Sequence, residues 1–197
     1  MDDATLRLLV NRMVRAAKLQ RGLYAEVAAD ITATRQAVAV VVITALAAFI
    51  SDQIGPPDLS WLGIPAEADG GSSFGILLLI IGPILAIVAW LAWSVVAWYV
   101  GTRMIAQDSQ DVQFLEVARA IGFAQTPSVL GVTLFIPVLG LIIQVGVLFW
   151  VLATGFIAIR ESMRLTDGQA AGTMVVSVIA FFVMTAMTTA IVGLAIP

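Results

Sequence analysis

The chain has 197 residues, of which 60% are hydrophobic and only 12% are charged. A soluble domain carries about 25% charged residues, so this composition excludes one and indicates a single all-α membrane bundle of about five helices, each crossing using ~20 apolar residues. Cys and His are both absent, which excludes disulfides, the common soft metal and haem ligands, and His-dependent catalysis. We therefore expect no cofactor and no metal.

The basic residues indicate which way the chain crosses the bilayer. All ten fall in segments that can share one side, and Lys and Arg concentrate on the cytoplasmic side of membrane proteins. The charged residues of the loop assigned to the other side are all acidic, among them Asp58, Glu67 and Asp69. This pattern predicts a cytosolic N-terminus and a C-terminus on the opposite side. The basic positions are Arg7, Arg12, Arg15, Lys18, Arg21, Arg35, Arg103, Arg119, Arg160 and Arg164.

The N-terminal stretch from Thr5 to Gln20 has the period of an amphipathic helix. Its apolar arc and its basic arc lie on opposite sides, which is typical of a helix in the plane of the membrane interface. One interpretation is an anchor that binds anionic headgroups, and the other is a helix that packs its apolar arc on the protein itself. We expect Gly22 to interrupt this helix and residues 1–30 to form a cytosolic or interfacial segment. The apolar arc holds Leu6, Leu9, Val10, Met13, Val14 and Ala17, and the candidate lipid contacts are Arg7, Arg12, Arg15 and Lys18.

Residues 31–197 are expected to form the five-helix transmembrane domain. The first crossing is Ile31–Ser51, with Asp30 as its N-cap, because a carboxylate there accepts from the exposed first-turn amides. The stretch Asp52–Ser73 is rich in Pro and Gly and predicts a loop. The second crossing lies within Phe74–Thr102, where Pro83 predicts a kink, since proline removes a helix hydrogen bond.

A short amphipathic helix is expected at Val112–Phe123, with Glu116 and Arg119 as a pair. The uncharged residues from Ala120 to Ile159 are enough for two crossings, with the turn at Pro137–Gly140. Pro127 is expected to bend the third crossing near its start. The fifth crossing is Thr173–Ile196.

Few residues in the predicted crossings suggest catalysis or ion transport. Between their boundary charges the crossings contain no Asp, Glu, Lys or Arg, whereas ion-coupled transporters and proton pumps usually place such residues in the membrane interior. Gln144 is the strongest intramembrane polar group; it either bonds across helices or lines a polar substrate site. The sequence has no GxSxG, HExxH or P-loop motif.

Two segments resemble the Yip1 family, in its prokaryotic members. Tyr24-Ala25-Glu26-Val27-Ala28-Ala29-Asp30 is similar to the family's entry to its first helix. Phe114–Ala124, followed by Thr126-Pro127, is similar to the cytosolic lead into its third helix. The resemblance implies a five-helix layout with a cytosolic N-terminus, and it carries no catalytic residue. Eukaryotic relatives are linked to vesicle traffic, Rab GTPases and membrane shaping.

The leading hypothesis is a non-enzymatic integral membrane protein, either an accessory or scaffold subunit of a larger membrane complex or a membrane-organising factor. The expected partners are membrane lipids and other integral membrane proteins or further copies of the chain, not nucleic acid. The expected location is a bacterial cytoplasmic membrane. An alternative is a transporter or channel for a neutral or lipid-like substrate, supported by two Pro-broken helices in a bundle with Gln144. An enzyme is a third hypothesis, for which the sequence offers no clustered polar groups.

Overall fold

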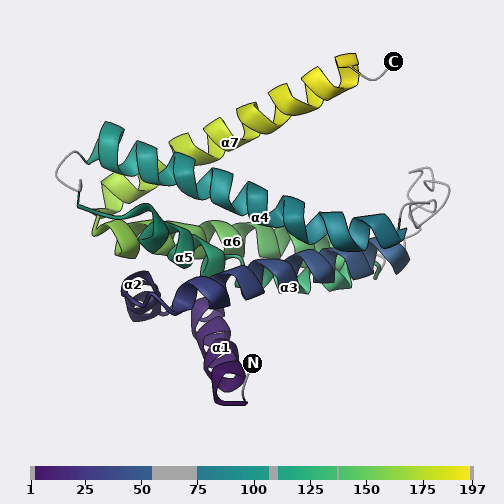
Figure 1. Cartoon of the computed structure of the whole chain (residues 1–197), viewed down its shortest axis with the longest axis horizontal. Helices are drawn as coiled ribbons and strands as arrows, with labels where there is room; N and C mark the ends of the chain where they lie inside the picture. Colours follow the sequence, from purple (N-terminus) through teal and green to yellow (C-terminus); the bar gives the residue numbers. More distant parts are fainter. Residues whose placement is uncertain (1–2, 55–74, 107–110, 137, 196–197) are drawn as a thin grey trace.

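The computed structural model describes residues 3–54, 75–106, 111–136 and 138–195, and within these parts it is helical without strands. The elements in chain order are α1 (Asp3–Ala17), α2 (Arg21–Ala29), α3 (Ala33–Ile54), α4 (Gly75–Tyr99), η2 (Val100–Ile105), α5 (Phe114–Ala124), η4 (Thr126–Thr133), α6 (Leu139–Met163) and α7 (Asp167–Ala195). The long helices run side by side along one direction (Figure 1), whereas α1 stands across it. The predicted all-helical class is confirmed.

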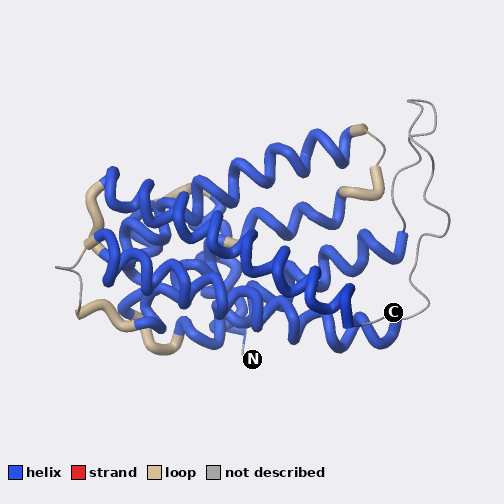
Figure 2. The backbone as a smooth tube through the Cα atoms, turned by 90° about the horizontal axis from the view of Figure 1, so that it is seen from above, coloured by secondary structure: helices blue, strands red, loops and turns tan. Residues whose placement is uncertain are grey.

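Three of the described helical segments are long and apolar enough to cross a bilayer: Ala33–Ser51, Leu79–Ile105 and Leu139–Met163. The apolar stretch found in α7, Asp167–Val183, is shorter. Figure 2 shows the long helices side by side, running between the two ends of the bundle. The multi-pass membrane architecture is therefore clear, while the count of five crossings remains a prediction. The predicted loop Asp52–Ser73 begins later than expected, because α3 continues to Ile54, and the rest of it lies outside the described residues.

The third crossing differs from the single span that the sequence predicts. The helix α5 ends at Ala124, and a 3-10 helix, η4, follows it from Thr126 to Thr133. Pro127 occupies the first turn of η4, where its missing N–H costs nothing but where it stops the helix that precedes it. Pro127 therefore ends one helix and begins another, instead of bending a continuous one. Pro83 lies inside α4, which continues through it.

The break between α1 and α2 also lies elsewhere than predicted. Leu19 adopts a left-handed conformation, with φ of 58°. The Gln20 N–H donates to the Arg15 carbonyl and the Leu19 N–H to the Ala16 carbonyl, which is a Schellman ending. Gly22 lies within α2. The prediction that Gly22 interrupts the helix is wrong, because this local hydrogen-bond motif closes α1 before the glycine is reached.

The core of the bundle forms where α5 lies against α2, α3, α4 and α6. Every residue of α5 from Val117 to Ala124 is buried. Gly122 allows α5 to approach α3 closely, because a Cβ there would lie 2.8 Å from the Cβ of Ala37. Trp90 and Trp93 are buried too, as expected for indoles that pack between helices.

The turn into α6 depends on one glycine. A Cβ at Gly140 would lie 2.6 Å from the Thr133 carbonyl oxygen and 2.7 Å from that of Leu134. Both atoms belong to the backbone, so neither can rotate away. We expect Gly140→Ala to lower the free energy of unfolding by about 1–3 kcal/mol, as overpacking does.

The matched control is Gly146→Ala on the same helix, where a Cβ meets nothing within 4 Å. That change should be neutral or stabilising by up to about 1 kcal/mol, because alanine favours the helix. Thermal unfolding of both variants in the same detergent measures the difference. Equal melting temperatures for the two variants would contradict the packing argument.

Candidate functional site: the junction of α1 with the membrane bundle

Arg12, on α1, is buried in a cluster of polar side chains from α2 and α3. Only 5% of the residue is exposed. Its Nε and Nη2 donate to Glu26 Oε1 at 3.1 and 3.0 Å, its Nη2 donates to Asp30 Oδ2 at 2.7 Å, and its Nη1 donates to Gln36 Oε1 at 2.9 Å. The guanidinium thus binds three separate elements, α2, the α2–α3 link and α3. Arginine suits this role because its planar group presents several fixed donors.

A second arginine of α1 extends the cluster to its exposed edge. The Arg15 Nη1 donates to Glu26 Oε2 at 2.8 Å, and its Nε donates to Gln20 Oε1 at 3.2 Å. Glu26 therefore accepts from one arginine on each of its oxygens. Charge-assisted bonds of this kind are about twice as strong as neutral ones.

The carboxylates of the cluster are held in their charged form. Burial raises the pKa of Glu26, but the hydrogen bonds from Arg15 and Arg12 outweigh it, and the net pKa lies below its ordinary value. The Thr32 hydroxyl and N–H hold the pKa of Asp30 below its ordinary value, with Arg12 adding to them against the effect of burial. The Thr32 N–H belongs to the turn ahead of α3, which begins at Ala33, so Asp30 fixes the turn into α3, and its role as the N-cap of that helix stays a prediction.

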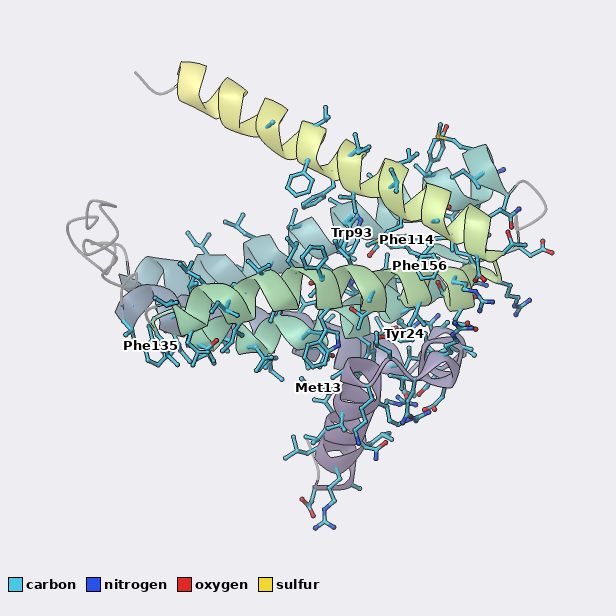
Figure 3. The ribbon with its side chains drawn as sticks, turned by 180° about the vertical axis from the view of Figure 1, so that it is seen from behind. Met13, Tyr24, Trp93, Phe114, Phe135 and Phe156 are labelled. Atoms are coloured by element: carbon cyan, nitrogen blue, oxygen red, sulfur yellow. The ribbon has the colours of Figure 1, made fainter. Side chains whose placement is uncertain are left out.

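The last turn of α1 is fixed by two aromatic side chains. The Tyr24 hydroxyl donates to the Ala16 carbonyl at 3.2 Å, and the Trp150 indole N–H donates to the Ala17 carbonyl at 2.8 Å. The last four carbonyls of a helix have no partner within it; the Trp150 indole satisfies that of Ala17, and the Tyr24 hydroxyl adds to the bond that Ala16 accepts from the Leu19 N–H. Figure 3 shows Met13 and Tyr24 at this junction of α1 and α2 with the bundle.

The outward part of α1 exposes two adjacent rows of side chains, an apolar row and a basic row. Leu6, Val10 and Val14 are 48%, 51% and 47% exposed. Arg7 and Lys18 are also exposed. The third row, with Leu9, Arg12 and Ala16, is buried. The two interpretations of the predicted apolar arc therefore each apply to part of it: Leu9 packs on the protein, and the row at positions 6, 10 and 14 does not.

The candidate lipid contacts thus have different surroundings. Arg7 is exposed and pairs with Asp3 at 2.9 Å, and Lys18 is exposed at the end of α1. Arg15 is half-buried against Glu26. Arg12 has almost no surface left for a headgroup, because three acceptors surround its guanidinium. The sequence pattern gave no sign of these acceptors. Lipid contact by Arg7, Arg15 and Lys18 remains a prediction.

The other predicted polar residues bond within the bundle. Gln144 Nε2 on α6 lies 3.5 Å from the Gly131 carbonyl of η4, so it contacts a neighbouring element. Arg119 is 5% exposed and its Nε donates to the Leu115 carbonyl at 2.8 Å. The ion pairs of the described residues do not include the predicted one between Glu116 and Arg119.

Sequence reasoning overlooked the residues that receive α1. Gln36 and Trp150 carried no motif. Tyr24 and Glu26 stood inside the segment that resembles the Yip1 family, and their positions ahead of a membrane helix were the only signal available. A basic residue on a helix is ordinarily solvated, so the burial of Arg12 follows from tertiary contacts alone.

We expect Arg12→Met to release α1. The change leaves Glu26 and Asp30 without their shared donor, and breaking a buried pair costs ~3–5 kcal/mol. Both carboxylates are partly exposed and can regain water, so a loss of about 2 kcal/mol is expected. Thermal unfolding and trypsin cleavage after Lys18 measure it. Arg7→Met, at a residue whose side chain is 81% exposed, is the control, and equal behaviour of the two variants would contradict the role of Arg12.

The same cluster predicts an acid-dependent release of α1. Because the folded pKa values of Glu26 and Asp30 are lowered, their stabilisation is fully present above the ordinary carboxyl pKa of about 4 and is lost as the pH falls through the lowered values. The chain has no Cys, so spin labels at Val10→Cys and Ile31→Cys report the distance directly. The distance should hold from neutral pH down to about 4 and lengthen below it. A transition near neutral pH would contradict this assignment.

Comparison with known proteins identifies the family. The sequence model of the Yip1 domain matches residues 25–188, which is most of the chain. The match covers α2 from its fifth residue, the whole α5–η4 region and most of α7. Among curated proteins and among solved structures, none matches the chain significantly. The chain is a multi-pass membrane protein that belongs to the Yip1 family.

Proposed function

We propose that the protein is a non-enzymatic integral membrane protein that organises the leaflet on its basic side, by itself or as an accessory subunit of a larger membrane complex. One observation carries the proposal. The helix α1 stands across the direction of the bundle (Figure 1) and exposes an apolar row beside a basic one. A helix with these two rows lies at the boundary of headgroups and acyl chains.

The apolar row is the part that enters the lipid. Leu6, Val10 and Val14 follow each other at intervals of four, so they form one line along α1. Each lies about half exposed beside the bundle. Arg7 and Lys18 border this line and are placed to meet anionic headgroups, which attract basic side chains by about 1 kcal/mol each.

The rigid attachment of α1 distinguishes this arrangement from a flexible anchor. Arg12 binds it to α2 and α3, and Trp150 binds its last turn to α6. A helix held in this way keeps a fixed depth and a fixed direction relative to the spans. It therefore acts as a wedge in one leaflet.

The membrane topology that we propose has five crossings. The helices α3, α4 with η2, α6 and α7 supply four, and α5 with η4 supplies the third in order. At ~1.5 Å per α-helical and ~2.0 Å per 3-10 residue, α5 and η4 together reach roughly 30 Å, the thickness of the hydrocarbon core. The end that carries Arg35, Arg103 and Arg160 then faces the cytosol.

Reconstitution into vesicles with and without anionic phosphatidylglycerol tests the wedge. A polarity-sensitive fluorophore at Val10→Cys should report an apolar site that brominated lipid quenches, while the adjacent Asn11→Cys should report water. Vesicles that contain the wild-type chain should be smaller or tubular by electron microscopy. The triple change Leu6→Ser, Val10→Ser and Val14→Ser should abolish the effect, and Asn11→Ser should keep it. Equal exposure of the two fluorophores to water would overturn the proposal.

A further inference from the structure

We infer that the protein holds an uncharged lipid in a cavity of about 500 Å³ that is lined by α3, α4, η4, α6 and α7. This volume lies within the range of ~300–1,000 Å³ typical of ligand sites. The cavity is separate from the α1 junction, and the inference does not depend on the proposed function. Four features of its wall identify the kind of ligand.

The first feature is depth. The wall residues fall between Val41 and Ala48 on α3, between Ala86 and Trp93 on α4, between Gln144 and Leu152 on α6, and between Val178 and Phe182 on α7. These stretches lie within their helices and away from the helix ends, so the cavity lies within the membrane-spanning part of the bundle. Among the residues that the structure describes, no charged side chain lines it. A charged ligand would remain unpaired there, at high cost.

The second feature is the direction of the opening. Leu148 on α6 and Phe182 on α7 both line the cavity, yet they are 56% and 66% exposed. The wall is therefore open between these two helices. Since both residues are apolar and lie on membrane-spanning helices, the opening faces acyl chains, and a ligand enters from the bilayer.

The third feature is a polar strip on the side of η4. Gln125, Ser128, Gly131 and Gln144 contribute to the wall. The bond from Gln144 Nε2 to the Gly131 carbonyl is 3.5 Å long, at the outer limit of a hydrogen bond. A plain acyl chain against this strip would leave amide and hydroxyl groups poorly solvated, which is unfavourable in an apolar environment.

The fourth feature is the indole of Trp93. The residue is 8% exposed and lies between α6 and α7 (Figure 3). It lines the cavity, and its Nε1 is buried with no acceptor among the described residues. Buried donors without a partner are rare and cost about 1–3 kcal/mol. A turn of the ring toward the cavity would bring this donor to a ligand oxygen as its acceptor.

Together these features identify a neutral lipid whose apolar chain carries a hydroxyl or carbonyl oxygen. Diacylglycerols and isoprenoid alcohols or quinones share this chemistry. The strip next to η4 meets the oxygen, and the apolar walls of α3, α4 and α7 meet the chain. Binding needs no transport step, so the cavity serves equally as the site of a resident lipid.

Photolabelling of the full chain in phosphatidylcholine nanodiscs tests this site. Three probes carry a diazirine in the apolar chain: a diacylglycerol, an isoprenoid alcohol and a phosphatidylcholine. One of the neutral probes should label the stretches 144–152 and 178–182 about tenfold more than phosphatidylcholine does, a preference equal to ~1.4 kcal/mol. The stronger of the two neutral probes identifies the source of the lipid.

Two variants show whether the label reports the cavity. Ala86→Phe fills the cavity and should remove the preference, whereas Val88→Phe, on the exposed side of the same helix, should keep it. Gln144→Leu removes the amide and should reduce the preference about tenfold without lowering the melting temperature, which covers the case in which Ala86→Phe fails to fold. Equal labelling by all three probes, or an unchanged preference in Gln144→Leu, would overturn the inference.

Discussion

The arrangement of the bundle depends on how the carbonyls around the α5–η4 segment obtain hydrogen-bond donors. In a bilayer every backbone polar group must bond inside the protein, because there is no water to replace a lost partner. A break in a membrane helix frees such groups. The indole of Trp90 donates to the Ala118 carbonyl at 3.0 Å, that of Trp98 donates to the Val112 carbonyl at 2.8 Å, and the Thr154 hydroxyl donates to the Ala124 carbonyl at 2.8 Å. The donor from α6 thus satisfies the last carbonyl before the break, whereas the two indoles of α4 hold the start and the middle of the α5 region against α4.

The break also explains why the bundle has a cavity. A 3-10 helix is thinner than an α-helix and turns its groups outward differently, so η4 fills less of the space between α3 and α6 than a continuous α-helix would. Gln125, Ser128 and Gly131 lie on the part that follows Ala124, and all three reach the cavity wall. The polar strip is therefore a consequence of the same break that Thr154 stabilises.

Much of this molecule follows from the sequence, but the sites do not. Apolar runs and the placement of Pro and Gly predicted the helices, since length and hydropathy are local properties. Asp30 was predicted as a cap for the same reason. The buried Arg12 was not, because a helical period shows that a basic residue shares a side with Arg15 but cannot show that Glu26, Asp30 and Gln36 converge on it. The ending of α1 at Leu19 was missed because this position usually holds glycine, whereas here a leucine adopts the φ of 58° and two backbone hydrogen bonds close the motif around it.

The two segments that resemble the family are the two junctions of the structure. Residues 24–30 supply Tyr24, Glu26 and Asp30, which hold α1. Residues 114–124 form α5, whose Ala118 carbonyl accepts a hydrogen bond from the Trp90 indole of α4. Both segments are rich in small and apolar residues because a helix must approach its neighbours closely there, as Gly122 does beside Ala37. One junction fixes a helix across the bundle and the other creates a cavity within it. Changes at Arg12 should therefore leave the cavity intact, and changes at Gln144 should leave α1 attached, because the two sites share no side chain.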